Sequence, residues 1–285
     1  PLLYAARQGC LDCARQLLEH GAEVDLEDPD GITPLLSALL NARFDTAKYL
    51  LEHGANPNKW DWWGRTPLYA AVDYNTLPHG GRPDRPSLDD TTSLAMIELL
   101  LDAGANPNAQ LKLFPPYRSL RMDRGADAIL DIGTTPLLRA ARAGDVAAMK
   151  LLLERGALVD LPQQNGVTPL LAAAGFGANP IDTRGKFRTQ QEALAAVTVL
   201  LDAGADVTRA DVNKRTPLHA AAQQGYTDVA RLLAERGGDL TAADVDGVTP
   251  LDAALGKMRS GRGRASAGEA HEQTAAALRE LAQAR

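Results

Sequence analysis

Two short apolar patterns alternate along the chain, and each has the spacing of an amphipathic helix. The first follows Thr-Pro-Leu and carries small residues on a narrow apolar face, as in TPLHAAA at 216–222. The second ends in glycine, as in the run from Val146 to Leu153 that continues into ERGA. Thr caps a helix, Pro fits its first turn, and Gly adopts the left-handed conformation that ends one. The patterns predict paired helices, which we call helix A and helix B.

These patterns recur with a fixed period. Pro-Leu occurs at seven positions, with four of the six spacings equal to 33 residues: Pro1, Pro34, Pro67, Pro136, Pro169, Pro217 and Pro250. The glycine that ends helix B recurs at Gly21, Gly54, Gly104, Gly156, Gly204 and Gly237. Longer spacings place insertions of 17 and 15 residues between helices A and B of the third and fifth repeats, and one of 19 residues before the fourth.

Neither helix of a pair can bury its apolar face alone, so neighbouring repeats must stack. Stacking creates one continuous core whose contacts join sequence neighbours. We expect Leu218 of helix A and Leu232 of helix B to lie in that core. Their replacement by Ala is expected to leave a buried cavity.

Residues 216–240, TPLHAAAQQGYTDVARLLAERGGDL, resemble an ankyrin repeat almost position for position, and ITPLLSALL and GRTPLYAAV are weaker copies. The resemblance covers 234 of the 285 residues once the three insertions, 51 residues in all, are set aside. The arrangement of repeats and insertions is similar to that of bacterial ankyrin proteins with lengthened loops. The repeats are assigned to about 1–31, 32–64, 65–111, 134–166, 167–214, 215–247 and 248–285.

The resemblance implies an all-α ankyrin-repeat solenoid of paired antiparallel helices, with β-hairpin fingers between repeats and a single domain over 1–285. Helix A and the fingers would then form a concave face that binds partners. Fold does not specify the partner.

The two ends of the chain depart from the regular repeat. The first repeat lacks the leading Thr and the finger, so we expect Pro1 to be a cut inside a longer protein. The last repeat contains a Gly/Ser/Arg segment at 256–268, expected to be a solvated loop, and a helix over 269–285. No secretory signal or membrane-length apolar run is seen, which leaves the localisation open.

The three insertions, about 73–93, 110–133 and 175–189, bracket the fourth repeat. Loops of this length are usually functional or disordered. We expect the insertions and helix A of the fourth repeat, through Arg139 and Arg142, to form one aromatic-lined cationic cleft for an anionic ligand. The alternative is that the insertions merely cap exposed helix ends.

Aromatic and guanidinium groups that would line this cleft alternate in the second insertion, and Phe176 comes from the third. Stacking and bidentate hydrogen bonds to carboxylate or phosphate would hold the ligand. The alternative is that the aromatic rings anchor the loop while the arginines pair with Asp123, Asp127 and Asp131. The candidates in the second insertion are Phe114, Tyr117, Arg118, Arg121 and Arg124.

All three tryptophans, Trp60, Trp62 and Trp63, lie in one finger. Exposed Trp is a frequent binding hot spot because it buries much area at little entropic cost. The alternative is that the rings pack beneath the lengthened neighbouring finger, and the two interpretations can hold for different rings.

Catalytic candidates are few. His79 lies in the first insertion near Asp73 and Tyr74, and a His with carboxylate and phenol neighbours can perform acid–base chemistry. No nucleophile elbow, phosphate loop or metal signature accompanies it. His219 stands in the TPLH motif, where we expect a structural hydrogen bond to neighbouring backbone.

Charge and cysteine content narrow the classes of partner. The net charge of −6 and the pI near 5.4 disfavour nucleic acid. Cys10 and Cys13 lack the second ligand pair of a zinc site, so we expect ordinary thiols and no metal. We expect a monomer without a cofactor.

The sequence thus predicts a recognition scaffold for a protein or peptide that uses the concave face, the Trp-bearing finger and the inserted loops. A binder of a small anionic molecule or glycan over the fourth repeat is the alternative. An enzyme with a loop-built active site is the third and least favoured class.

Overall fold

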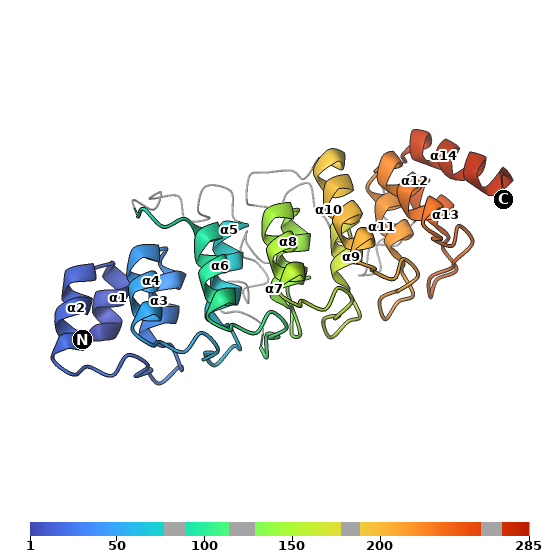
Figure 1. Ribbon diagram of the computed structural model, residues 1–285. Helices are drawn as coiled ribbons and strands as arrows, with labels where there is room; N and C mark the ends of the chain where they lie inside the picture. The colour runs from blue at the N-terminus through green and yellow to red at the C-terminus, as the bar shows by residue number, and fades with distance from the viewer. Residues whose placement is uncertain (77–88, 114–128, 178–188, 258–269, 285) are drawn as a thin grey trace. The chain divides into compact units, whose positions relative to one another are not determined.

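The computed structural model describes residues 1–76, 89–113, 129–177, 189–257 and 270–284. In these ranges the regular structure is helical, and no strand occurs. The helices are α1 (Leu2–Gln8), α2 (Leu11–Glu19), α3 (Pro34–Leu40), α4 (Phe44–Glu52), α5 (Pro67–Asn75), α6 (Ser93–Asp102), α7 (Pro136–Ala143), α8 (Val146–Glu154), α9 (Pro169–Ala173), α10 (Gln190–Asp202), α11 (Pro217–Gln223), α12 (Thr227–Glu235), α13 (Pro250–Ala254) and α14 (Glu272–Gln283) (Figure 1). The predicted all-α repeat architecture is confirmed.

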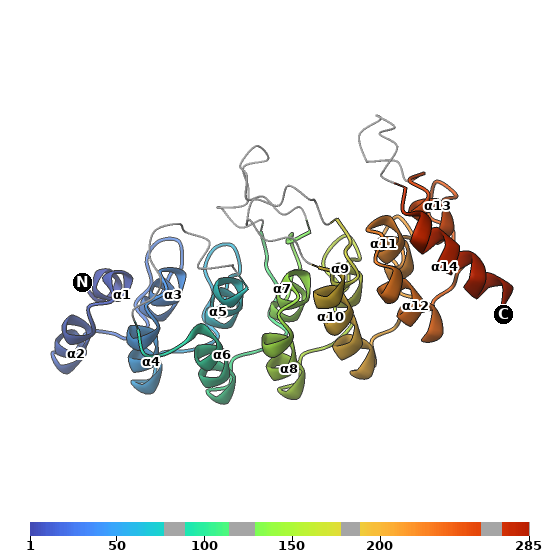
Figure 2. The same ribbon diagram turned by 90° about the horizontal axis from the view of Figure 1, so that it is seen from above.

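The chain divides into two compact parts. The N-terminal part holds Pro1–Ala140 and Ala147–Leu158, and the C-terminal part holds Ala141–Val146, Val159–Asp182 and Phe187–Arg285. In the N-terminal part, α1, α3 and α5 pack in one row, while α2, α4 and α6 pack in a second (Figure 2). In the C-terminal part, α11 packs between α9 and α13, and α12 packs between α10 and α14. Within each part, these helices contact their pair partners and the corresponding helix of a neighbouring repeat.

The Thr-Pro pair starts helix A as the sequence indicates. In α3, α5, α9, α11 and α13 the threonine Oγ1 accepts the N–H three residues later, and Pro occupies the first turn. At Thr33 the acceptor lies 3.2 Å from the amide nitrogen of Leu36. The cap satisfies an amide that has no partner inside the helix.

The fingers are short hydrogen-bonded turns. In the second finger the N–H of Asp61 donates to the carbonyl of Arg65 at 3.2 Å, and Gly64 adopts a positive φ of 82°. Successive fingers are joined through their backbones, since the N–H of Trp62 donates to the carbonyl of Asp30 at 2.7 Å. The predicted hairpins are thus seen as turns, without a regular strand in the described residues.

The prediction of the core is wrong at one position of α12. Leu218 is fully buried, as expected, but Leu232 is only half-buried and Leu233 is fully buried in its place. The buried stripe of α12 runs through Val229, Ala230 and Leu233. At about 100° per residue, Leu232 falls beside that stripe.

The boundaries of the first insertion also need correction. The segment was expected to leave the helix at Asp73, but α5 continues through Asn75, so Asp73 and Tyr74 are helical. Beyond the insertion, α6 begins at Ser93 behind the N-cap Thr92. The interior of the insertion, 77–88, lies outside the described residues.

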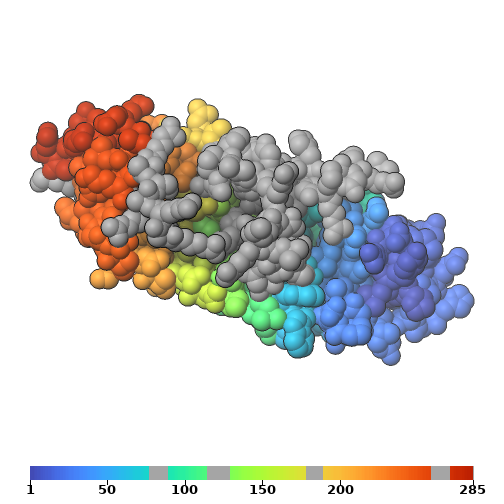
Figure 3. Space-filling view, turned by 180° about the vertical axis from the view of Figure 1, so that it is seen from behind, coloured from blue at the N-terminus to red at the C-terminus, as the bar shows by residue number. Residues whose placement is uncertain are grey.

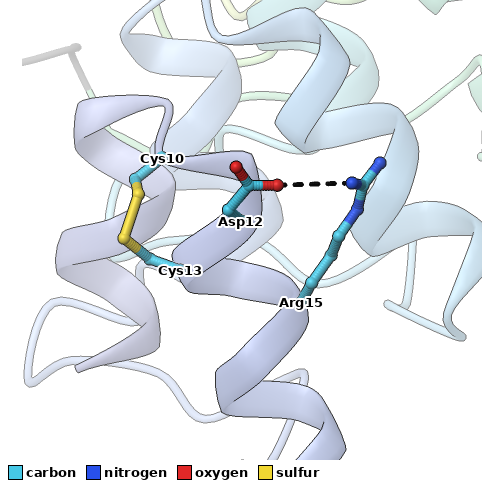
Figure 4. Close-up of a disulfide and its surroundings, with 4 residues drawn as sticks. All are labelled: Cys10, Asp12, Cys13 and Arg15. Carbon is cyan, nitrogen blue, oxygen red and sulfur yellow. Dashed lines mark hydrogen bonds and ion pairs between the residues drawn. A yellow bond between two sulfur atoms is a disulfide. The ribbon is translucent and has the colours of Figure 1, made fainter.

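The expectation of two free thiols is wrong. Cys10 and Cys13 form a disulfide, with Cys10 at the N-cap of α2 and Cys13 in its first turn (Figure 4). Their Cα atoms are 5.2 Å apart, which is within the range that a disulfide spans. The first turn of a helix brings residues three apart onto one side, so this spacing allows a bond as readily as two thiols.

Core truncation tests the register of α12. Leu218→Ala and Leu233→Ala are each expected to lower the free energy of unfolding by about 2–4 kcal/mol, because each leaves a buried cavity. Leu232→Ala should cost clearly less, since water already reaches this side chain. Urea denaturation followed by circular dichroism measures all three, and an equal loss for Leu232→Ala and Leu233→Ala would contradict the register.

Candidate functional site

The buried carboxylate of Asp61 stabilises the turn of the Trp-bearing finger. Asp61 accepts the N–H groups of Trp63 at 3.1 Å and of Arg65 at 2.9 Å. Its second oxygen accepts Nε of Arg65 at 2.6 Å, and both side chains are buried. Charge-assisted hydrogen bonds to a buried carboxylate are stronger than ordinary ones. The finger is therefore a fixed platform.

The three tryptophans take different positions on this platform. Trp62, at the tip, is 66% exposed, and Trp60 is 47% exposed. The ammonium of Lys112 lies 3.1 Å from the ring centroid of Trp60, while the guanidinium of Arg65 lies 5.1 Å from that of the half-buried Trp63. One ring is thus open, one is partly covered by the neighbouring finger, and one packs at the base.

The same Asp–Arg pairing recurs in a finger of the C-terminal part, and its arginine contacts Phe176. Asp211 binds Nε and the terminal nitrogen of Arg215 at 3.0 and 2.7 Å. The guanidinium of Arg215 lies 4.5 Å from the ring centroid of Phe176, which is almost fully buried. The ring of Phe176 thus forms a cation–π contact inside the protein.

The two arginines of the predicted cleft are both engaged within the protein. Arg139 is fully buried, and its Nε binds Oδ1 of Asp73 at 2.5 Å. Arg142 is nearly buried and donates to the carbonyl of Gly177 at 3.0 Å, one residue beyond Phe176. The other predicted cleft residues, Phe114, Tyr117, Arg118, Arg121 and Arg124, lie outside the described residues.

The catalytic candidates in the described residues likewise have contacts within the protein. His79 lies outside the described residues. Asp73 is paired with Arg139, and the ring of Tyr74 packs edge-on against Phe44 with 5.1 Å between centroids. Within the described ranges, no three His, Cys, Asp or Glu side chains meet as metal ligands would.

The C-terminal end of the first insertion is hydrogen-bonded to a helix of the preceding repeat, which the sequence did not predict. Oδ1 and Oδ2 of Asp45, at the start of α4, accept the N–H groups of Thr91 at 2.9 Å and Asp90 at 3.0 Å. Partial burial raises the pKa of Asp45, but the hydrogen bonds from Thr91 and Asp90 outweigh it and lower that pKa overall. The far end of the first connection is thereby fixed to the preceding repeat.

A local sequence signal could have found where the third connection ends. Thr189 and Glu192 form a capping box at the start of α10, with the Thr189 N–H donating to the Glu192 carboxylate at 2.9 Å. Thr followed three residues later by Glu is the signature of such a start. Helices α2, α4 and α12, which follow short connections, have no side-chain cap.

His219 makes the structural hydrogen bond expected of it. Its Nε2 lies 3.0 Å from the carbonyl of Val248, and its Nδ1 accepts the N–H of Thr216 at 3.2 Å. Nε2 therefore carries the proton and Nδ1 is bare, which is the neutral ring. Burial is the main cause that lowers the pKa of His219, and the bond to Val248 opposes it.

Paired helices joined by hydrogen-bonded fingers, with neighbouring pairs packed together within each part, define a stacked helical-repeat protein. The chain belongs to the ankyrin-repeat family: the family model described as "Ankyrin repeats (3 copies)" matches residues 2–111 and 189–261, and the "Ankyrin repeat" model matches 132–163. Together these matches cover more than half of the chain.

Two curated relatives match over part of their length. The chain is 31% identical to human neurogenic locus notch homolog protein 4 over 136 residues, which is 46% of this chain and 6% of that protein. It is 39% identical to mouse ankyrin repeat and SOCS box protein 16 over 99 residues, 35% of this chain and 20% of that protein. The chain thus spans no more than a fifth of the length of these relatives.

Solved ankyrin structures match most of the chain. The ankyrin repeat domain of human ASB11 matches with a TM-score of 0.63 and 25% identity, covering 99% of this chain and 97% of that one. An ankyrin repeat domain from Acinetobacter baumannii AYE matches with a TM-score of 0.63 and 24% identity, covering 84% and 98%. Human and bacterial proteins both appear, so these likenesses do not indicate the source of the chain. Of the helices in the described parts, none is long and apolar enough to cross a membrane.

The Asp73–Arg139 pair predicts a marked difference between the two arginines. Arg139→Met should lower the free energy of unfolding by about 3–5 kcal/mol, because it leaves the Asp73 carboxylate buried without its cation. The second change Asp73→Leu should restore much of that loss. Arg142→Met is the matched control and should cost about 1 kcal/mol, the value of one hydrogen bond. Equal losses for Arg139→Met and Arg142→Met in urea denaturation would refute the assignment.

His219 predicts a pH dependence of stability. Because its folded pKa lies below the ordinary value of 6.5, the unfolded chain binds the proton more readily. Its contribution is therefore complete above that value and is lost as the pH falls below it, by up to about 1.4 kcal/mol per pH unit. His219→Gln should reduce the stability difference between about pH 7.5 and about pH 5.5. An unchanged difference would show that His219 is not the group responsible.

Proposed function

We propose that the chain is a protein-binding scaffold that contacts its partner chiefly through the Trp-bearing finger. Ankyrin repeats are generally scaffolds for protein–protein interaction, so the family assignment favours a protein as the partner. The observation that carries the proposal is the exposure of Trp62 at 66% on a rigid finger. The proposal includes the A helices and the inserted loops as further contact surface.

Trp62 has the properties of a binding anchor. An indole buries a large area while losing the freedom of only two side-chain torsions. The backbone beneath it is already ordered, because its N–H is bonded to Asp30 and the turn is bonded to Asp61. A partner that covers this ring would bury apolar surface without first ordering the finger.

The surroundings of Trp62 favour a partner with both apolar and acidic groups. The carbonyl of Trp63 accepts the N–H groups of Lys112 at 2.9 Å and Leu113 at 3.2 Å, so the next finger borders the tryptophans. Lys112 holds its ammonium over the exposed ring of Trp60, and Leu113 is partly exposed. An apolar partner side chain flanked by a carboxylate would complement this edge.

The described residues give less support to the other classes. Arg139 and Arg142 already interact with Asp73 and the Gly177 carbonyl, so an anionic ligand would have to compete with internal partners. Asp73 and Tyr74 likewise have structural contacts. We therefore develop the protein-binding function alone.

Photo-crosslinking followed by affinity measurement tests the proposal. Trp62→p-benzoylphenylalanine should give a crosslinked adduct in cells that produce the chain, and mass spectrometry would identify the adduct. The matched control places the same group at Val245, which stands exposed at the tip of a C-terminal finger. For the protein so identified, Trp62→Ala should weaken binding by about 30-fold, a hot-spot loss of about 2 kcal/mol, and Val245→Ala should change it little.

Two outcomes would contradict the proposal. One is the absence of a specific adduct at Trp62. The other is an affinity that Trp62→Ala and Val245→Ala alter equally while circular dichroism shows both variants folded.

A further inference from the structure

The Cys10–Cys13 disulfide has no role in the proposed binding finger. These are the only two cysteines of the chain, and they occupy the N-cap and the first turn of the nine-residue helix α2. Figure 3 shows surface of the first residues, drawn in dark blue. Cys13 is exposed and Cys10 is half-buried. The exposed position of Cys13 favours access of a reagent to the bond without unfolding of the repeat.

Stability does not account for this bond. Arg43 and Tyr226 stand at the N-caps of α4 and α12, the positions that correspond to Cys10, and these repeats form the same helix pair without a disulfide. The bond joins residues only three apart. Closing so short a loop removes little freedom from the unfolded chain. The repeat is thus expected to stay folded when the bond is reduced.

The helix end favours cleavage with Cys10 as the leaving sulfur. No side chain caps α2 at Cys10, so a thiolate there lies at the positive end of the helix, next to amide donors of the first turn. This end of a helix favours the negative charge of a thiolate, which makes Cys10 the better leaving group. The carboxylate between the two cysteines, Asp12, points away from them to Arg15 at 3.3 Å (Figure 4).

We propose that Cys10 and Cys13 form a reversible thiol–disulfide exchange site for a partner that carries a dithiol–disulfide couple. One thiolate of the reduced partner attacks Sγ of the exposed Cys13, which forms a mixed disulfide and releases Cys10 as a thiolate. The second thiolate of the partner then attacks the partner's sulfur in that mixed disulfide. This closes the partner's disulfide and releases Cys13 as a thiolate. Two electrons pass from the partner to the pair, the partner leaves as a disulfide, and protons from water convert the released thiolates to thiols.

Alkylation and mass spectrometry test the exchange in the folded full chain. The chain is equilibrated with mixtures of glutathione and glutathione disulfide, or with dithiothreitol, and then treated with N-ethylmaleimide. We expect unmodified and doubly alkylated chains to interconvert in both directions without loss of the helical circular dichroism signal. A bond that is reduced only after denaturation, or a reduced pair that glutathione disulfide does not oxidise, would overturn the proposal.

Single-cysteine variants separate the roles of the two sulfurs. With glutathione disulfide, Cys10→Ser should accumulate a stable glutathione adduct on Cys13, because the thiol that resolves it is gone. Cys13→Ser should form its adduct on Cys10 about tenfold more slowly, because Cys10 is half-buried and a thiolate stabilised by the helix end is the weaker nucleophile. Equal rates, or faster reaction at Cys10, would contradict the assignment of Cys13 as the attacked sulfur. Both variants are checked for an unchanged circular dichroism spectrum.

Discussion

The packing of neighbouring helix pairs within each part is the constraint on which the other features depend. A helix such as α11, with seven residues, is too short to be stable alone, and its apolar face is covered by α9, α12 and α13. The same requirement explains the Thr-Pro start, which fixes where each helix A begins, and the buried His219, which ties α11 to the carbonyl of Val248. Stability within each part is therefore shared between neighbouring repeats.

Stacking also creates the surface that is proposed to bind. Successive fingers are joined by backbone hydrogen bonds, such as those from Trp62 to Asp30 and from Lys112 to Trp63, and the turns at Asp61, Asp211 and Asp244 are each held by a buried carboxylate. The repeat thus orders the backbone and leaves the side chain at the tip free to vary. Trp62 and Val245 occupy corresponding tips with very different side chains, which is how a repetitive fold acquires a specific contact.

The sequence predicted the features that depend on local chemistry. The Thr caps, the helix-ending glycines and the His219 bond follow from short motifs, and the structure confirms them. It did not predict that Asp73 pairs with Arg139, because 66 residues separate them and the length of α5 decides where Asp73 points. Leu232 and Leu233 are chemically alike, so only the packed helix distinguishes them.

The cysteine pair shows a different limit of sequence reasoning. The spacing of Cys10 and Cys13 was understood to place them on one side of a helix, but the same spacing fits thiols and a disulfide. The binding roles predicted for Trp60, Trp62 and the other site residues stay predictions.

Fluorine NMR of the chain labelled with 5-fluorotryptophan tests the central claim most directly, because all three tryptophans lie in the proposed contact finger. Each resonance reports one ring, and a partner that is not labelled adds no signal. Our account predicts that the resonances of Trp62 and Trp60 shift when the crosslinked partner is added, while that of Trp63 moves less. A saturated complex in which all three resonances keep their free positions would contradict it.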